Sequence, residues 1–439
     1  MIANNTQNVL LSNLTIRGRG GESVVQIQGS SSARMLDCTV TREEGKGGGD
    51  AVRVVGSGLS VLGSSSLVAK GCTMQSGSGS GLVVFKGGKV ALDNCVSSDS
   101  KGYGWVVVGE GSRMQARGSK ADGNEKLNVY VGAGASAVFS SCSMGSSSSN
   151  SGLFVTGKGS TATANSCIIS GNQLSNVVVV EGAFLTLEDC ECNGSKKCGW
   201  VVVGEGSRMV ARDSRAEGNE KSNAWVGAGA SAFFSCCSMD LSNSGVGLDV
   251  RGKCSTATAK ACSISSNQDG NVWVNEGASL TLEDCKCNGS KGDGWVVKGE
   301  GSSIVAKGSK AQRNEEANVW VNYGASAVFS SCNMGSSSSG VGLTVEGKGS
   351  TATAKACSIS GNQDDNVLVW GGANATLINC ESKGSKEHCG WWVDEEDSWL
   401  VASSSTAVSN ADGNAVTRAG GKIVCLNNCD LGGTDILQM

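Results

Sequence analysis

The sequence contains no proline, only one histidine and only 5% aromatic residues. Because proline lacks the N–H that a β-ladder requires, its absence is typical of a backbone held largely in sheets. No stretch has the length and apolarity of a transmembrane helix, and the first 13 residues lack the basic region and long apolar run of a signal peptide. The formal net charge of −4 comes without a basic stripe. We therefore predict a cytoplasmic protein with neither a membrane nor a nucleic acid as its partner.

Glycine, by contrast, is abundant, with 65 residues, and it belongs to a repeated unit of about 24 residues. A longer repeat is superimposed: GWVVVGEGSRM at Gly104 returns at Gly199, and as GWVVKGEGSSI at Gly294, each 95 residues on. A fixed period of this size indicates a stacked array of structural repeats. The residues that open successive units are Gly81, Gly104, Asn128, Gly152, Asn176, Gly199, Asn223, Gly247, Asn271, Gly294, Asn318, Gly342, Asn366, Gly390 and Asn414.

Each unit holds three short stretches in which apolar and polar residues alternate, separated by turns rich in glycine, serine and asparagine. This pattern predicts short strands and no helices. We predict an all-β fold: a single-stranded parallel β-helix, or solenoid, of about 18 coils with three parallel sheets. One domain is expected over residues 1–439, with 95-residue super-repeats from about 104 to 413 and no capping element at either end. The chain is therefore expected to be a fragment of a longer protein.

A column of small residues and a column of asparagines are expected to face inward. Thirteen of the 20 cysteines fall at one position of the unit, where serine replaces them in every fourth coil, so we interpret them as free core residues in a reducing compartment. Stacked asparagines at a strand spacing of about 4.8 Å can share hydrogen bonds along the axis. The cysteine column is Cys38, Cys72, Cys95, Cys142, Cys167, Cys190, Cys237, Cys262, Cys285, Cys332, Cys357, Cys380 and Cys429, with Ser119, Ser214, Ser309 and Ser405. The asparagine column is Asn124, Asn172, Asn219, Asn267, Asn314, Asn362 and Asn410.

Segments such as NVLLSNLTIRG (Asn8 to Gly18) and SLTLEDCKCNGS (Ser279 to Ser290), with the stacked columns, resemble the right-handed parallel β-helix of the pectate-lyase-like superfamily. The resemblance implies the fold over almost the whole chain, but it does not imply one activity, because this fold carries many. The polygalacturonase motifs NTD, GHG and RIK are absent, and the DPHD motif of mannuronan epimerases cannot occur without proline. The chain is also similar to the β-helix region of F-box ubiquitin-ligase adaptors, which bind proteins.

The catalytic candidates are few. Asp249 with Arg251 is the one acidic and basic pair on the outward column of the first sheet, and we favour reading it as a solvated surface ion pair over a general base. His388, beside Cys389, lies in a turn without an orienting third group, so a nucleophilic site is not expected there. No metal site, no cofactor and no assigned catalytic residue are predicted, and an enzyme is the less favoured reading.

The outward aromatic residues of the first sheet remain as binding candidates. An apolar stripe on a soluble protein usually marks a binding surface. We predict a recognition protein that holds a protein partner along this column, and the alternative is a protein that binds or modifies an extended polysaccharide, because aromatic faces stack on sugars. Self-association, end to end or laterally, is a further possibility, and a second copy could cover the stripe. The predicted binding residues are Tyr130, Phe154, Trp225, Trp273, Trp320, Trp370 and Trp392.

Overall fold

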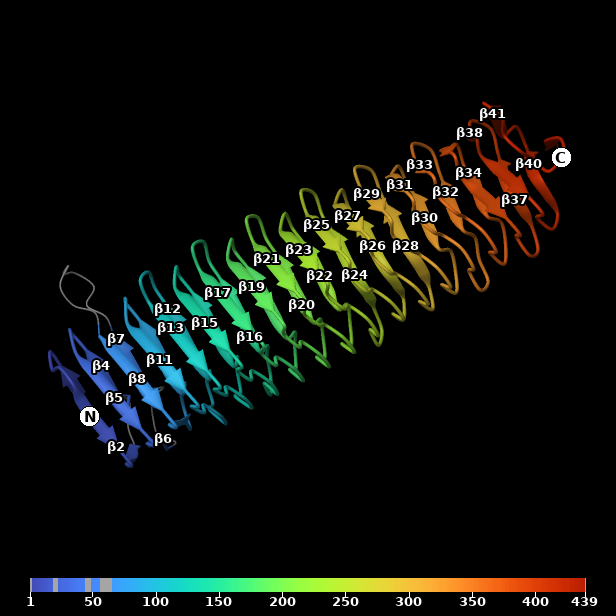
Figure 1. The fold of residues 1–439 in the computed structure, drawn as a ribbon. Coiled ribbons are helices and arrows are strands. Elements are labelled where there is room, and N and C mark those ends of the chain that lie inside the picture. The colour runs from blue at the N-terminus through green and yellow to red at the C-terminus, as the bar shows by residue number, and fades with distance from the viewer. Residues whose placement is uncertain (1, 19–22, 44–48, 56–64, 439) are drawn as a thin grey trace. The chain divides into compact units, whose positions relative to one another are not determined.

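The computed structural model describes residues 2–18, 23–43, 49–55 and 65–438. Its contacts divide the chain into two compact units, Met1–Asn219 and Glu220–Met439. Each unit is a parallel β-helix in which every strand pairs with its counterparts one coil before and one coil after (Figure 1). The described residues contain no helix that is long and apolar enough to span a membrane. The prediction that residues 1–439 make one domain remains a prediction.

In the first unit, sheet A comes from the stretch that follows each opening residue, and sheet B from the next stretch along the chain. The strands of sheet A are β1 (Ile2–Asn4), β4 (Val25–Gln28), β7 (Val52–Val55), β10 (Leu82–Phe85), β12 (Trp105–Val108), β14 (Val129–Gly132), β16 (Leu153–Thr156), β18 (Val177–Val180) and β20 (Trp200–Val203). The strands of sheet B are β2 (Val9–Ser12), β5 (Ser32–Leu36), β8 (Ser66–Lys70), β11 (Lys89–Asp93), β13 (Arg113–Arg117), β15 (Ser136–Ser140), β17 (Thr161–Asn165), β19 (Phe184–Glu188) and β21 (Arg208–Arg212).

The second unit repeats this plan. Its sheet A contains β22 (Ala224–Gly227), β24 (Val246–Arg251), β26 (Gly270–Asn275), β28 (Asp293–Lys298), β30 (Val319–Asn322), β32 (Leu343–Glu346), β34 (Val367–Trp370), β37 (Cys389–Asp394), β40 (Gly413–Arg418) and β42 (Leu437–Gln438). Its sheet B contains β23 (Ser231–Ser235), β25 (Thr256–Lys260), β27 (Ser279–Glu283), β29 (Ser303–Lys307), β31 (Ser326–Ser330), β33 (Thr351–Lys355), β35 (Asn374–Ile378), β38 (Trp399–Ser403) and β41 (Lys422–Leu426).

The third side of each coil is the thinnest. In the first unit it forms strands only at β3 (Thr15–Gly18), β6 (Thr39–Arg42) and β9 (Thr73–Ser76) among the described residues, and in the second unit only at β36 (Glu381–Lys383) and β39 (Thr406–Val408). Elsewhere single parallel bridges, such as Ser143 to Ile168 and Ser263 to Lys286, continue the ladder. The three predicted parallel sheets are therefore present, with the third reduced to one bridge per coil over most of its length.

One residue with positive φ turns the chain from sheet B to the third side in successive coils. Gly118, Ser141 and Asp189 have φ of 56°, 51° and 52° at this corner. The left-handed conformation is tolerated best by glycine, asparagine and aspartate. This requirement explains the polar and glycine-rich corners of the sequence.

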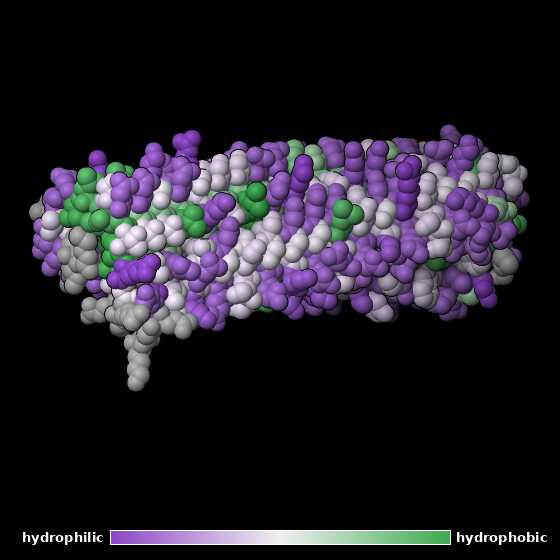
Figure 2. All heavy atoms as spheres, turned by 90° about the horizontal axis from the view of Figure 1, so that it is seen from below, coloured by the Kyte–Doolittle hydropathy of each residue, from purple (hydrophilic) through white to green (hydrophobic). Residues whose placement is uncertain are grey.

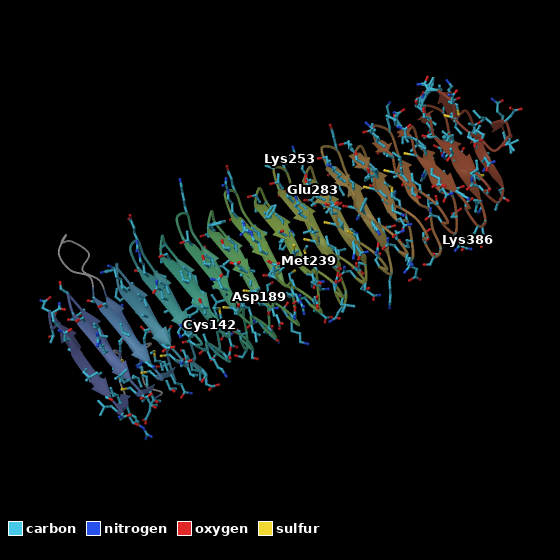
Figure 3. The ribbon with its side chains drawn as sticks, viewed as in Figure 1. Cys142, Asp189, Met239, Lys253, Glu283 and Lys386 are labelled. Carbon is cyan, nitrogen blue, oxygen red and sulfur yellow. The ribbon has the colours of Figure 1, made fainter. Side chains whose placement is uncertain are left out.

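The core is narrow and is filled by the inward side chains of all three sides. Trp105, Trp200, Trp295 and Trp391, each fully buried, fill the interior behind sheet A. Cys142 and Met239 lie inside their coils, whereas Lys253 and Lys386 project from the turns (Figure 3). The face drawn in Figure 2 is mostly hydrophilic, as expected where the apolar side of each strand is turned inward.

The predicted inward columns are confirmed as buried except at their last members, Asn410 and Cys429, which are half-buried, and none of the 20 cysteines forms a disulfide. The asparagine column, however, does not bond to itself. Each of its amides bonds instead to an opening asparagine: in the second unit Asn314 Nδ2 donates to Asn318 Oδ1 at 2.8 Å, and Asn318 Nδ2 donates to Asn362 Oδ1 at 2.8 Å. Because every amide both donates and accepts, these buried polar groups are satisfied without water.

Candidate binding site

Three predicted tryptophans of the second unit lie on the outward face of sheet A. The strand register sets Trp225 beside Asp249, Asp249 beside Trp273, Trp273 beside Val296 and Val296 beside Trp320. Successive tryptophans are therefore two strands, or ~10 Å, apart. The predicted spacing is confirmed within this unit.

The tryptophans are less exposed than the sequence indicated. Trp225, Trp273 and Trp320 are half-buried. The residues that lie between them on the sheet, Asp249 and Val296, are only 2% and 6% exposed although they occupy outward positions. An outward position on this sheet is thus not the same as a solvated one.

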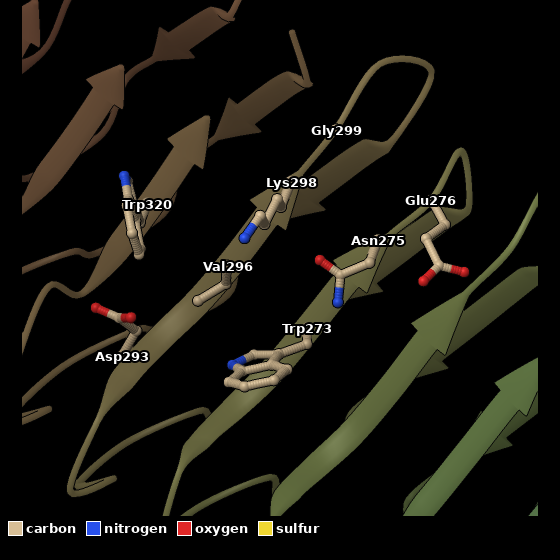
Figure 4. A pocket seen from close by; sticks show the side chains of 8 residues that line it. All are labelled: Trp273, Asn275, Glu276, Asp293, Val296, Lys298, Gly299 and Trp320. Carbon is tan, nitrogen blue, oxygen red and sulfur yellow. The ribbon is translucent and has the colours of Figure 1, made fainter. Parts of the chain in front are cut away.

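A groove of about 440 Å³ lies between Trp273 and Trp320, with Val296 between them (Figure 4). Trp320 is fixed by a hydrogen bond of 2.8 Å from its Nε1 to Glu346 Oε2. Polar groups stand around the apolar centre. The remaining lining residues are Asn275, Glu276, Asp293, Lys298 and Gly299.

Asp293 is the carboxyl group most strongly perturbed in this groove. Burial, together with the negative charge of Glu316, raises its pKa to about 6. The backbone N–H of Ala317, one coil further on, donates to Asp293 Oδ1 at 2.9 Å and opposes this rise. The groove therefore presents a carboxyl group that changes charge near neutral pH, between two aromatic faces.

Asp249 and Arg251 differ from the sequence-based expectation. Instead of a solvated surface pair, the structure shows a buried Asp249, 2% exposed. Its carboxylate accepts two hydrogen bonds from the Arg251 guanidinium, of which Nε to Oδ1 measures 3.0 Å. Burial raises the pKa of Asp249, and Arg251 opposes the shift. The Arg251 guanidinium lies 5.9 Å from the ring centre of Trp225. Arg251 contacts both Asp249 and Trp225. Because it holds the Asp249 carboxylate in an ion pair, Asp249 is not available as a free general base.

Trp370 and Trp392 share a second, smaller groove with Leu368, Asp394 and a polar cluster. The cluster joins Asp364 and Asp365, which precede β34, to His388, which precedes β37. Burial, reinforced by the charges of Asp364 and Asp412, raises the pKa of Asp365 to about 7. The His388 ring meets Trp392 edge-on, with 6.3 Å between ring centres. The histidine is half-exposed, and the expectation that it has no orienting group was wrong, because Asp364 and Asp412 flank its ring.

Tyr130 and Phe154 belong to the first unit and to neither groove. They stack on each other with ring centres 5.9 Å apart and an angle of 9° between planes. Tyr103 extends the row, 5.9 Å from Tyr130, and Lys126 lies 5.6 Å above the Tyr103 ring. Burial raises the pKa of Tyr130. The aromatic rings here pack against one another.

Sequence reasoning missed the residues that come just before the opening residue of a coil. Tyr103, Asp293 and Asp365 all occupy this position, and all three lie beside outward aromatic residues. In the other coils this position holds Ser, Ala, Val, Leu, Gly or Cys, so the three large or charged residues could have been recognised as exceptions in the sequence. The outward column that suggested a binding surface begins three residues further on in each coil, so it did not include them.

The chain was compared with known proteins. A family model described as "Right handed beta helix region" matches residues 57–220, 207–350 and 296–435. No curated protein matches. Among solved structures, a TibC-catalysed hyper-glycosylated TibA fragment is 17% identical, with 93% of this chain and 98% of that chain covered and a TM-score of 0.34.

Two further solved structures are similar at the level of the fold. The mannuronan C-5 epimerase AlgE4 A-module of Azotobacter vinelandii is 12% identical, with 93% and 90% of the two chains covered and a TM-score of 0.27. The receptor-binding domain of the Siphovirus 9NA tailspike is 9% identical, with 98% and 74% covered and a TM-score of 0.24. None of these three is an F-box adaptor.

Proposed function

Since the chain belongs to the family of right-handed β-helix regions, we propose that it is a non-catalytic binding protein that holds an extended, uncharged carbohydrate chain across Trp273 and Trp320. The groove between these two indoles carries the proposal. It offers two aromatic surfaces ~10 Å apart, about the length of a disaccharide, on a rigid sheet. Sites on strands keep their geometry better than sites on loops.

The polar rim favours a saccharide over a purely apolar ligand. Asn275, Glu276, Asp293 and Lys298 surround the indoles, and such donors and acceptors match the hydroxyl groups of a sugar, whose C–H faces stack on aromatic rings. Two acidic groups against one lysine disfavour a polyuronate, since like charges in a part-buried groove repel. An uncharged glucan or mannan is therefore the expected class.

A panel of soluble polysaccharides tests the proposal by affinity electrophoresis in native gels. We expect retardation by an uncharged glucan or galactomannan but not by polygalacturonate. Trp273→Ala and Trp320→Ala should each lose about 5- to 150-fold in affinity, because stacking of a flat ligand face on one aromatic ring is worth about 1–3 kcal/mol. Trp399→Ala is the matched control: Trp399 is 38% exposed, but on sheet B. Equal retardation of all three variants would refute the groove as the site.

A second assay on the same proteins distinguishes binding of the polysaccharide from its cleavage. Reducing ends and unsaturated products are measured after incubation of the retarding polysaccharide with the wild-type chain and with Asp293→Asn. A non-catalytic protein leaves the polymer length unchanged in both. Shortening that depends on Asp293 would replace the binding proposal with a polysaccharide-cleaving one.

A protein partner is the second candidate, and Trp225 with Arg251 favours it. Tryptophan and arginine are the residues most enriched at the centres of protein interfaces, and here the guanidinium is held over the indole by the buried Asp249. A second copy of the chain is the partner tested most directly. Sedimentation over a range of concentrations should show a dimer that Arg251→Ala weakens and Trp399→Ala does not.

A further inference from the structure

The cluster formed by Asp364, Asp365 and His388 has the ligand set and the spacing of a divalent-cation site. One ligand atom from each residue lies within 4.8 Å of the other two. His388 Nε2 lies 3.5 Å from Asp364 Oδ1. Two ligands of one tetrahedral ion with bonds of about 2.1 Å lie ~3.4 Å apart, so the imidazole and the carboxylate already stand at the separation that a shared ion imposes.

The repeat places these groups in one column. Asp364, His388 and Asp412 are each two residues before the opening residue of their coil, and each is 24 residues from the next. The backbone agrees with this stacking, because the N–H of Asp412 donates to the carbonyl oxygen of His388 at 3.2 Å. The one histidine of the chain is thus held between two carboxylates by the register of the β-helix.

Asp365 supplies a buried ligand atom. Its side chain is 5% exposed and lines the groove. The backbone N–H of Cys389 donates to Oδ1 at 2.8 Å, and within the described residues no donor is bonded to Oδ2. Oδ2 is therefore the Asp365 oxygen that is open to a cation from the side of the groove.

Asp412 completes the arrangement from the other side of the imidazole. Its Oδ2 lies 3.9 Å from His388 Nδ1. Histidines that bind metals almost always donate their second ring N–H to a carboxylate, a carbonyl or water, which fixes the ring and its tautomer. Nε2 is the nitrogen nearest the Asp364 carboxylate, and Asp412 faces the other nitrogen from beyond hydrogen-bond distance, close enough to act as a positioning residue through its charge.

We propose that Asp364, Asp365 and His388 Nε2 bind one divalent first-row transition-metal ion, with Asp412 orienting the imidazole. Two carboxylates and one imidazole suit Mn²⁺, Co²⁺ or Zn²⁺, and they leave further coordination positions open toward the groove of Trp370 and Trp392. This site is separate from the groove at Trp273, and it stands whether or not that groove binds carbohydrate.

Co²⁺ is the probe, because its spectrum reports its ligands. Binding to the full chain under reducing conditions is measured by equilibrium dialysis, and the visible and near-ultraviolet absorption of the bound ion is recorded. We expect one Co²⁺ per chain with weak visible bands and without the intense near-ultraviolet band of thiolate ligation. His388→Gln and Asp364→Asn should each weaken binding at least tenfold, and Asp412→Asn by about tenfold.

Asp269→Asn is the matched control. Asp269 occupies the same place in its coil as Asp364, two residues before the opening residue, but Gly292 stands where His388 follows Asp364. Its loss should leave Co²⁺ binding unchanged. Thermal unfolding of each variant without metal confirms that the fold is retained. Three results would overturn the proposal: no stoichiometric Co²⁺, equal affinity in His388→Gln and wild type, or a thiolate band that assigns the ion to cysteines.

Discussion

Cysteine and serine exchange in the inward column because their side chains make the same two hydrogen bonds. The N–H of Cys95 donates to Ser119 Oγ at 3.0 Å, and the N–H of Cys142 donates to Cys167 Sγ at 3.4 Å. In return Ser119 Oγ donates to a carbonyl two residues back at 2.9 Å, and Cys142 Sγ does so at 3.4 Å. The column therefore links coils as well as filling space, which the sequence alone did not indicate.

Burial makes two further core thiols, which lie outside this column, poor nucleophiles. It raises the pKa of Cys192 and of Cys287 well above the ordinary thiol value. Because the thiolate is the reactive form, these cysteines are protected from oxidation as long as the coil stays closed. Cys236, Cys254 and Cys425 are the exposed thiols of the chain, and alkylation of the folded protein should begin there.

At the same scale, Asp293 predicts an unusual dependence of stability on pH. Its pKa is about 6 in the folded chain against an ordinary value of 3.8, so the folded state binds the proton more tightly than the unfolded state. Stability from this group is therefore fully present below about pH 4 and is lost as the pH rises through 6. Asp293→Asn should be more stable than wild type at pH 7.5, by up to about 3 kcal/mol.

Denaturant unfolding of both proteins between pH 4 and pH 7.5 measures this effect. The asparagine keeps an oxygen that can accept the Ala317 N–H, so the comparison isolates the charge. The advantage of Asp293→Asn should shrink steadily toward pH 4. An advantage that stays constant with pH would show that Asp293 is ionised and well solvated in the groove.

At the scale of the element, the alternation of glycine and asparagine at the opening position has a steric cause. A Cβ on Gly342 would lie 2.5 Å from Ile359 Cγ2 and 2.6 Å from the carbonyl oxygen of Asn366. It would also collide with the Asn362 amide that bonds to Asn366. The hydrogen bonds between column and opening asparagines form an asparagine ladder. Glycine opens the coils that pack against this ladder in the following coil, and asparagine opens the coils that supply it.

Gly342→Ala should consequently lower the free energy of unfolding by about 1–3 kcal/mol, the usual loss on overpacking a core. Gly227→Ala is the control in the same unit. Gly227 lies on β22, where a Cβ would meet only the Trp225 indole and a carbonyl oxygen, both beyond 3 Å, and the next coil carries Arg251 at that position. Chemical denaturation compares the two, and equal losses would rule out the ladder as the reason for glycine.

The elements themselves were largely predictable, while the site was only partly so. Period-two alternation located the strands, because inward residues such as Leu248 and Val250 cannot exchange with their outward neighbours. The thinning of the third side to single bridges was not predictable from a three-residue stretch. The burial of Asp249 was not predictable either, since it depends on the side chains of the neighbouring strands and not on the alternation within its own. The cluster of Asp364 and His388 could be predicted only with knowledge of which residues of neighbouring coils lie side by side.

At the scale of the whole molecule, the pattern of opening residues and the pattern of the cysteine column repeat together only after four coils. Glycine and asparagine alternate every second coil, and serine replaces cysteine in every fourth. Removal of residues 271–365, which is 95 residues, joins Gly270 to Asn366 and restores the same order of glycine, asparagine, cysteine and serine. Removal of residues 271–293 instead brings two opening glycines together and leaves the Asn267 amide without Asn271, to which it donates at 3.0 Å.

We expect the 95-residue deletion to unfold cooperatively with a Tm close to that of the full chain. The 23-residue deletion should be the less stable of the two, because a buried amide that loses its partner costs about 1–3 kcal/mol. Circular dichroism melts of the two purified proteins make the comparison. If the protein with the 23-residue deletion were as stable as the one with the 95-residue deletion, the order of opening glycines and asparagines would not matter for stability.

The four-coil repeat also bears on how such a chain is inherited. Nearly identical segments 95 residues apart, as at Gly104 and Gly199, are substrates for unequal crossing-over, which adds or deletes whole copies. Each exchange preserves the amide ladder, so its product folds and is exposed to selection for length alone. Alleles of this gene should therefore differ by multiples of 95 codons, and the surface they offer should lengthen or shorten in the same steps.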